Sequence, residues 1–252
     1  MRTVVIKSSI VSILAVAISY SIRQSFQTQN FLGDVSGLSA FLTVFGTLFG
    51  IMTAFIIFEV WGQWNQLSKL IDMEATGLES MFRLCLYLND SRVEKEMKKA
   101  IFNYASMVMK GKFSRLGSGI RNPKAGMAFR EIFKVLRSIQ FDDSKDPIVF
   151  PMIVEQGGKL QETRTKRINQ SLTRLPKILK LFFYISSIFV VLTLMTMPFA
   201  QFFYQVLAVG SIAYLIAFAV QLIKDLDNPF VGHFRLTPEP FERALKHIEE
   251  DY

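Results

Sequence analysis

The sequence contains very little of the chemistry that enzymes and metalloproteins use. A single cysteine, Cys85, rules out an intramolecular disulfide and a multi-cysteine metal site, and its apolar helical surroundings indicate a core residue. The two histidines, His233 and His247, form no HxxxH or HExxH pattern. A glycine-rich phosphate loop, a nucleophile elbow and a pair of carboxylates within an apolar run are missing as well. We therefore predict no enzymatic activity, no bound metal and no cofactor.

Charged residues are missing from long stretches of the chain. Of 252 residues 50% are hydrophobic, the mean hydropathy is +0.30, and 24 residues are phenylalanine. That is more apolar material than a soluble domain of this length can bury. The hydrocarbon layer of a bilayer is about 30 Å thick, so a helix needs roughly 20 apolar residues to cross it. The sequence predicts four transmembrane helices, at residues 6–22, 38–58, 181–197 and 202–223.

The first apolar run follows Arg2 and includes Lys7, an arrangement that also occurs in signal peptides. A small-x-small cleavage site followed by a polar mature domain is not evident, and a second apolar run follows soon afterwards. We therefore interpret residues 6–22 as a retained span whose Lys7 side chain reaches toward the headgroups.

Basic residues are distributed unevenly between the connections. Most of the 29 lysine and arginine residues lie between Trp61 and Leu175, and others follow Ile223, whereas the remaining two connections hold only Arg23. The positive-inside rule then places the middle segment and both termini in the cytoplasm, with the spans in a bacterial inner (plasma) membrane. The net charge of +8 is mainly a topology signal. Because the basic residues alternate with acidic ones, we expect the lipid bilayer as a partner and not nucleic acid.

The middle segment is predicted to be a helical cytoplasmic domain, because apolar residues recur every three or four positions without strand-like alternation. One helix continues out of the second span, and Asn89, Asp90 and Ser91 offer caps for the next. The expected domain order is spans one and two (1–60), the helical domain (61–175), spans three and four (176–224) and a cytoplasmic turn and helix (225–252). Within the domain we expect helices at 91–109, 128–139 and 148 onward into the third span at Pro176, with a glycine-rich loop at 111–126.

Three aspartates, Asp142, Asp143 and Asp146, stand together before the last helix of this domain. Carboxylate oxygens can hold calcium, but the spacing matches no EF-hand loop. We therefore favour a solvated turn over a calcium site.

The second span has one narrow face of small or weakly polar residues, at steps of four and three. We call this face the small-residue stripe; it consists of Ser39, Thr43, Gly46, Gly50 and Thr53. Its GxxxG pattern is typical of close helix packing, whereas a longer face with hydroxyls also suits a water-filled path. Ile57 continues the stripe and could form a hydrophobic constriction. Glu59, at the inner end, is either an interfacial or intersubunit ion-pair residue or a charge at a pore mouth.

The end of the chain carries the most specific motif. The stretch LIKDLDNPFVGHFRLTPEPFERAL, residues 222–245, resembles the signature that closes the bestrophin-like family of unknown function. In that signature an Asp-Leu-Asp-x-Pro-Phe turn leaves the last span and a Pro-Glu-Pro segment begins a final helix. The matching residues are Asp225, Leu226, Asp227, Pro229 and Phe230, then Pro238, Glu239, Pro240, Phe241 and Glu242.

The residues of this motif also have a physical interpretation. Asp225 and Asp227 can accept hydrogen bonds from backbone amides beyond the turn, while Pro229 stops the preceding helix. Pro238 and Pro240 can start a new helix with acidic residues in its first turn. We therefore favour a rigid cap on the cytoplasmic domain over a ligand-binding role for the aspartates.

The order of spans and helical domain also resembles that family, so the resemblance covers essentially the whole chain. More distantly, the chain is similar to the bestrophin anion channels, which are oligomeric, mostly pentameric, and line their axis with the second span. This similarity implies a homo-oligomer, with a pentamer favoured and a tetramer as the alternative. Two departures limit it: residues 231–235 lack the acidic run that helps bestrophins bind calcium, and the second span lacks their proline-containing hydrophobic neck.

The predicted fold class is therefore an all-α membrane protein with four transmembrane helices, bestrophin-like and oligomeric. The predicted function is a passive channel for a small inorganic ion, whose central pore is lined by the small-residue stripe and Ile57, with Glu59 at its mouth. Hydroxyls and Glu59 favour cations, whereas the basic domain and the distant bestrophin likeness favour anions. The alternative is a non-conducting membrane scaffold whose cytoplasmic helices bind a partner protein.

Overall fold

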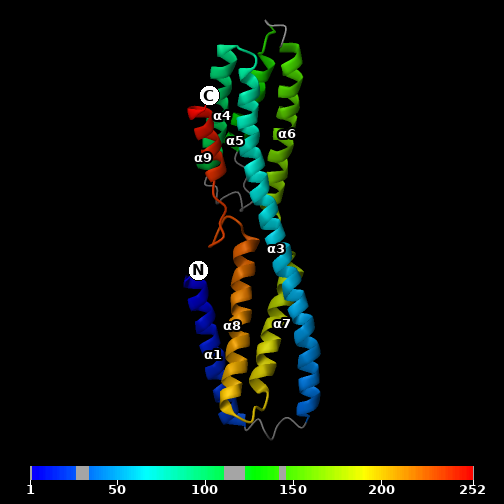
Figure 1. Cartoon of the computed structure of the whole chain (residues 1–252). Helices are drawn as coiled ribbons and strands as arrows, with labels where there is room; N and C mark the ends of the chain where they lie inside the picture. The colour runs from blue at the N-terminus through cyan, green and yellow to red at the C-terminus, as the bar shows by residue number, and fades with distance from the viewer. Residues whose placement is uncertain (1, 27–33, 111–122, 142–145, 252) are drawn as a thin grey trace. The chain divides into compact units, whose positions relative to one another are not determined.

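The computed structural model of the chain describes residues 2–26, 34–110, 123–141 and 146–251 (Figure 1). Every regular element in this described part is an α-helix, as the helical periodicity predicts. The chain divides into two compact units. The first unit contains Met1–Gly62 and Arg174–Asp227, and the second contains Gln63–Thr173 and Asn228–Tyr252.

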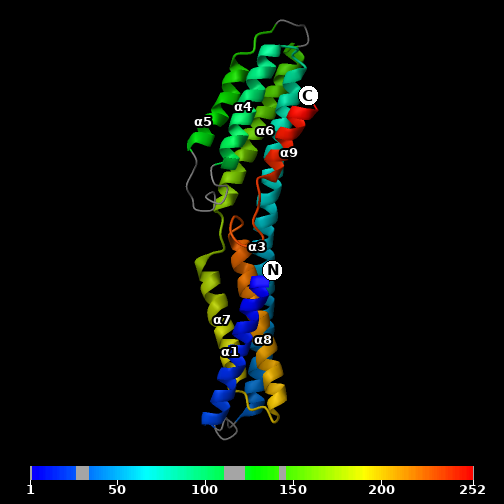
Figure 2. The ribbon, with the colours of Figure 1, turned by 90° about the vertical axis from the view of Figure 1, so that its left-hand side faces the viewer.

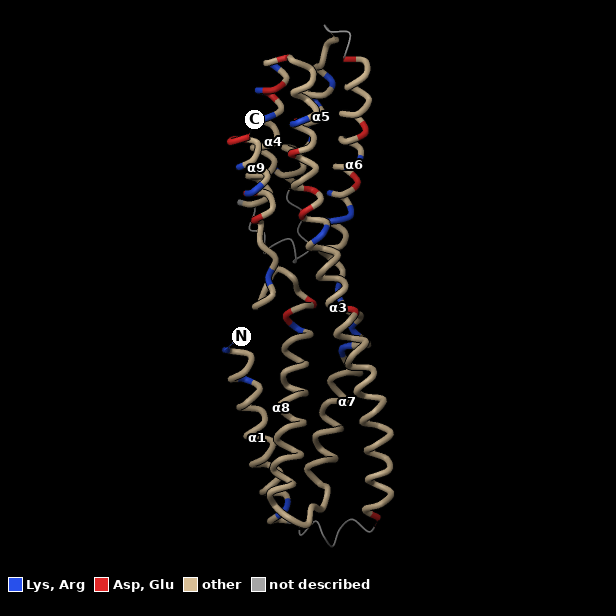
Figure 3. Tube along the Cα trace, viewed as in Figure 1, with Lys and Arg blue, Asp and Glu red and all other residues tan. Residues whose placement is uncertain are grey.

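The first unit is built from the apolar helices. They are α1 (Arg2–Phe26), the first part of α3 (Val35–Leu86), α7 (Lys177–Thr196) and α8 (Phe202–Asp227). Each corresponds to one of the four predicted spans, although α7 ends one residue before the predicted end at 197, and each belongs to a helical stretch that is long and apolar enough to cross a membrane. Figure 3 shows that lysine, arginine and acidic residues are sparse along these helices and lie near their ends. Prolines set several of the ends, because Pro176 precedes α7 and Pro229 follows α8 closely.

Polar side chains join α1 to α8, which lie side by side (Figure 2). The Ser12 hydroxyl donates a hydrogen bond to the carbonyl of Gly210 at 2.7 Å, and a Cβ at Gly210 would lie only 3.3 Å from Val16. The buried Gln205 amide donates to the Ser19 hydroxyl at 2.7 Å. Small residues and side-chain hydrogen bonds are the means by which helices associate where lipid offers no hydrophobic driving force.

Phenyl rings join α3 to α7. Phe41 and Phe45 contact Phe189 with ring centroids 5.9 and 5.1 Å apart, and Phe49 stacks on Phe183 at 5.9 Å. Aromatic pairs at these distances gain about 0.5–1.5 kcal/mol beyond the burial of their area. One face of α3 therefore contacts α7, and this face holds Phe41, Phe45 and Phe49 at steps of four.

The second unit is a helical bundle with a continuous apolar core. Its elements are the rest of α3, α4 (Ser91–Lys110), α5 (Pro123–Arg137), α6 (Asp146–Leu172) and α9 (Glu239–Glu250). The part of α3 in this unit contributes a stripe of fully buried residues at helical spacing to the core, including Leu67, Ile71, Leu78 and Met81. The close approach of α6 depends on Gly157, where a Cβ would lie 3.3 Å from Met81.

Two of the helix boundaries predicted for the middle domain are wrong, and proline explains both. Helix α5 begins at Pro123, so residues 123–126 are helical although we expected a loop to Gly126; proline fits the first turn of a helix because its missing N–H needs no partner there. Helix α6 ends at Leu172 and does not continue into α7, since Pro176 restricts the residue before it to extended backbone. The expected loop residues 111–122 lie outside the described residues.

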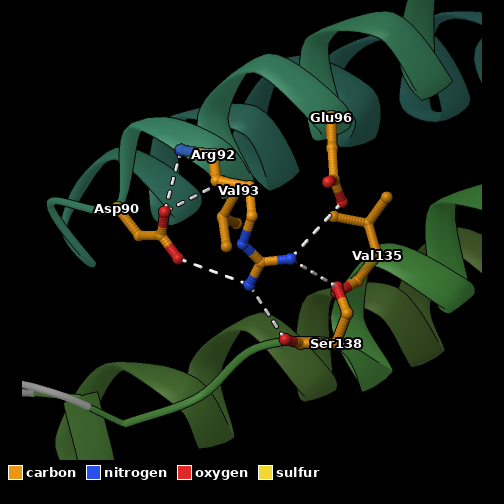
Figure 4. A network of polar contacts seen from close by, with 6 residues as sticks. All are labelled: Asp90, Arg92, Val93, Glu96, Val135 and Ser138. Atoms are coloured by element: carbon orange, nitrogen blue, oxygen red, sulfur yellow. Dashed lines mark hydrogen bonds and ion pairs between the residues drawn. The ribbon is translucent and has the colours of Figure 1, made fainter.

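The start of α4 is capped as predicted. Asp90 accepts hydrogen bonds from the backbone N–H groups of Arg92 and Val93 at 2.8 and 3.2 Å (Figure 4). The Arg92 guanidinium then reaches the end of α5, where it donates to the carbonyl of Ser138 at 3.0 Å, and it also lies 3.7 Å from Glu96. The cap therefore orients the side chain that links α4 to α5.

Candidate functional site

The small-residue stripe lies on α3 and is only partly covered by the described residues of its unit. Thr43 and Gly50 are exposed, and Ser39, Gly46 and Thr53 are only half-buried. A Cβ added at Gly46 or at Gly50 would meet no described atom within 4 Å. The GxxxG pattern therefore does not form a helix-packing seam within the described part of the chain.

The hydroxyls of the stripe are bonded to their own helix. Ser39 and Thr43 donate to the carbonyls of Val35 and Ser39 at 2.9 Å, and Thr53 donates to Phe49 at 2.8 Å. Each hydroxyl oxygen still has lone pairs, so it can accept a hydrogen bond from water or from a partner outside the chain. The face is therefore mildly polar without carrying charge.

Helix geometry separates α3 into three faces. With 3.6 residues per turn, the α3 phenylalanines that contact α7 and the small-residue stripe fall on neighbouring sectors of α3. A third sector carries large apolar side chains that are exposed in the single chain: Val44 (63%), Leu48 (59%), Ile51 (51%), Phe55 (68%) and Phe58 (77%). Lipid or another subunit has to cover this third face, because large apolar patches are not left in water.

Glu59 does not share the sector of the stripe. It lies nine positions after Gly50, which is two and a half turns of a regular helix, so the two residues fall on opposite sides of α3. The half-buried Ile57 does continue the stripe. The stripe and Glu59 therefore cannot both face one central axis squarely, and the geometry favours the interfacial interpretation of Glu59.

The first half of the carboxy-terminal signature ties helix ends together in the first unit. Asp227 Oδ1 accepts the backbone N–H of Leu175 at 2.7 Å, and its other oxygen pairs with Lys180. The amide that Asp227 binds therefore lies before α7. The prediction that this amide lies beyond the turn is wrong for Asp227. Asp225 is half-buried and lies two residues before the end of α8.

The second half of the signature belongs to the core of the second unit. Phe230 and Phe241 are both buried there, and Pro229 accepts the backbone N–H of Leu236 at 2.8 Å. Pro238 precedes α9, which carries Glu239 and Glu242 in its first turn, where acidic residues complement the helix dipole. Pro240 is half-buried within that turn. These contacts give the prolines a structural role.

A buried ionic cluster in the second unit was not predicted from the sequence. Glu74 of α3 is fully buried, accepts a hydrogen bond from the Tyr104 hydroxyl of α4 and pairs with Arg167 of α6, which is 3% exposed. Arg164 stacks over the ring of Phe129 at 4.7 Å and donates to the Tyr104 oxygen at 3.2 Å. The sequence could have indicated this cluster, because Glu74 and Arg167 each occupy a core position in an otherwise apolar helical stripe.

Electrostatics in this cluster favour the charged form of Arg167 and the neutral form of Tyr104. Burial opposes the charge on Arg167, but the Glu74 carboxylate outweighs it and holds the pKa of the guanidinium above its usual value. Burial, together with the same carboxylate, raises the pKa of the Tyr104 hydroxyl. Tyr104 therefore stays a neutral donor. The cluster joins α3, α4 and α6, and Arg164 extends it to Phe129 of α5.

The cysteine, the histidine of α9 and the acidic turn form no catalytic or metal-binding group among the described residues. Cys85 is fully buried, and burial raises the pKa of its thiol to about 12, which keeps it from acting as a nucleophile. His247 Nδ1 lies 3.3 Å from Glu79. Asp146 is 1% exposed, so it is not part of a solvated turn, while Asp142 and Asp143 lie outside the described residues. Within the part of the chain that the structure describes, no three metal-ligating side chains come together.

The family of the chain follows from comparison with known proteins. The Bestrophin-like domain family matches residues 8–241, nearly the full length. The chain belongs to the Bestrophin-like family. No curated protein matches it.

Solved structures show the same bestrophin fold. A leucine-to-threonine variant of a bacterial Bestrophin homologue from Klebsiella pneumoniae has a TM-score of 0.71 at 12% identity, over 98% of both chains. The same homologue solved by Zn-SAD phasing gives 0.67 at 13% identity, over 99% of this chain and 97% of that one. A membrane protein carrying a glycine-to-alanine change gives 0.71 at 11% identity, over 99% and 97%. The Bestrophin-like chain thus shares its fold with these proteins at very low sequence identity.

Proposed function

We propose that this Bestrophin-like chain forms a symmetric homo-oligomeric channel that conducts small inorganic ions passively through a central pore. The second unit and both termini lie on the cytoplasmic side of the inner membrane in this proposal. The observation that carries it is the small-residue stripe of α3, whose Gly46 and Gly50 have open space where a Cβ would be. A mildly polar face that the described residues of the chain leave largely open is suited to line water.

Oligomerisation is part of the proposal because four helices of one chain do not enclose a pore. Closed symmetry would place one copy of the stripe from each subunit around a shared axis. The family resemblance favours five subunits, with four as the alternative. The third face of α3, with Leu48 and Phe55, then contacts lipid or a neighbouring subunit.

The stripe also suggests how ions would pass. Glycines keep the path wide, and hydroxyls such as Thr43 and Thr53 provide partial hydration. One turn beyond Thr53, a ring of Ile57 side chains would form a hydrophobic constriction that can gate by dewetting. The sequence contains no ATP-binding motif, which is why the proposed transport is passive.

Two matched tryptophan variants test the pore face. Gly50→Trp adds a large ring where a Cβ meets no described atom, so the protomer can accommodate it, but several copies would fill a central path. Leu48→Trp adds bulk at nearly the same depth on the third face of α3, where Leu48 is 59% exposed. In planar bilayers we expect wild type and Leu48→Trp to carry current, and Gly50→Trp to lose at least about tenfold of the single-channel conductance, since conduction depends on pore dimensions.

Size-exclusion chromatography with mass measurement has to show the same oligomer for all three proteins. Block by Leu48→Trp with full current in Gly50→Trp would mean that the third face of α3 lines the axis. No current from a well-assembled wild-type oligomer would contradict the channel and favour the membrane scaffold that binds a partner protein.

A further inference from the structure

A groove in the first unit runs between α1, α7 and α8. It has a volume of about 720 Å³, and most of its lining is aliphatic, with Val11, Ile188, Leu192 and Ile216 among its walls. One end is different: the lining there includes Lys7 of α1, Tyr184 of α7, and Gln221 and Lys224 of α8.

The polar residues come together because α1 and α8 are antiparallel neighbours. The Gln221 amide donates to the Val4 carbonyl at 3.1 Å and to the Ser8 hydroxyl at 2.8 Å, which fixes the start of α1 beside the last turns of α8. Lys7 is therefore beside Gln221, and Lys224 follows within one turn, with its ammonium 5.6 Å from the Tyr184 ring centroid.

The charge at this end is not balanced within the groove. Neither Lys7 nor Lys224 forms an ion pair with a residue that the structure describes, and the lining contains no aspartate or glutamate. A single lysine at the end of a span usually reaches into the headgroup layer by itself. Here two lysines from different helices reach the mouth of one groove, which creates a site for a ligand with a negative charge.

The dimensions of the groove indicate what kind of anion this is. From Ala213 to Lys224 the lining extends over eleven residue steps of α8, or about 17 Å at the rise of an α-helix. One leaflet accounts for half of a hydrocarbon core that is about 30 Å thick. The groove therefore matches one leaflet in length, with an aliphatic part for acyl chains and a cationic part at the level of the phosphate.

We propose that this groove binds one anionic phospholipid of the leaflet on the side of the chain termini, with its phosphate between Lys7 and Lys224. The inference rests on the membrane placement of the proposed function but not on conduction. A second copy of the chain is the competing occupant, and it would have to bring a carboxylate to the two lysines.

Lipid retention measures the site directly. The oligomer is reconstituted in vesicles of equal phosphatidylglycerol and phosphatidylcholine, released into mild detergent, and analysed by native mass spectrometry for bound phospholipid. Since each lysine near an anionic headgroup contributes about a factor of five, we expect the preference for phosphatidylglycerol to fall by about 30-fold in Lys7→Gln/Lys224→Gln. Arg2→Gln/Lys177→Gln removes the same two charges from exposed positions that do not line the groove, and should retain the wild-type preference.

A third variant tests the acyl part. Leu192→Trp fills the aliphatic end at a position that is 52% exposed, and should lower the amount of both retained lipids while the oligomer stays intact. Equal retention in wild type and Lys7→Gln/Lys224→Gln would overturn the proposal. Dissociation of the oligomer in Lys7→Gln/Lys224→Gln, together with no lipid retained by wild type, would also overturn the proposal, because the groove would then hold a second copy of the chain. A protein that retains the lipid but carries no current would count against the channel alone.

Discussion

Glu74 and Arg167 form a buried ion pair in the second unit. Both are almost fully removed from water, and their attraction offsets a desolvation cost of several kcal/mol per ion only while both are present. Their pairing could not be deduced from one sequence, because their positions are 93 residues apart. What the sequence does offer is a charge at a core position of each helix, which requires a partner somewhere.

Removing one partner should destabilise the protein strongly. Glu74→Ala leaves the buried guanidinium unpaired, and we expect a loss of about 3–5 kcal/mol. For a chain of this size that corresponds to an apparent Tm about 10 °C lower in detergent. Glu155→Ala, which removes one half of an exposed pair with Lys159, should leave Tm within about 2 °C. An unchanged Tm in Glu74→Ala would contradict the structural role of the pair.

Asp227 gives a second test at this scale. Asp227→Asn keeps the size of the side chain but removes the charge that holds Lys180 and weakens the bond from the Leu175 amide. We expect a loss of about 1.5–3 kcal/mol, and faster hydrogen exchange in the peptide that contains Leu175. Asp72→Asn is the control, because Asp72 is exposed and its contact with Arg243 is 3.7 Å long. If exchange at Leu175 stays at the wild-type rate, Asp227 does not hold this junction.

At the scale of elements, the apolar helices were predictable because long charge-free runs have few alternatives. The sequence also predicted the start of α4 correctly, since Asp90 is a local cap that needs no distant partner. The predicted helix boundaries were wrong at two prolines, because a proline can either begin a helix or interrupt one. Pro123 begins α5, and Pro176 separates α6 from α7. The continuity of α3 through Gly62 was anticipated, and it is supported by Val60 and Leu67, which are buried on either side of that glycine.

At the scale of the whole molecule, the family follows from the carboxy-terminal signature, but the surface that faces an axis does not. Helical periodicity sorts residues into faces, and it places Ile57 with the small-residue stripe and Glu59 away from it. Which face meets the axis depends on contacts between subunits, and those are not encoded in the spacing of one helix. The two interpretations of Glu59 made from the sequence therefore differ in whether its charge affects ion selectivity: it does at a pore mouth and does not at an interface.

Reversal potentials under a tenfold salt gradient distinguish these interpretations. If the stripe lines the pore, Ile57→Glu adds a ring of negative charge to the conducting path, and we expect a shift toward cation selectivity of tens of millivolts, on the order of the 59 mV per decade limit for a monovalent ion. Glu59→Gln, two residues away at almost the same depth but on the other side of α3, should change the reversal potential by only a few millivolts, because its charge is outside the path and screened. The opposite pattern, with a large shift in Glu59→Gln and none in Ile57→Glu, would place the side of α3 that carries Glu59 on the axis. The sign of the wild-type reversal potential, measured in the same experiment, decides whether hydroxyls or the basic cytoplasmic domain dominate selectivity.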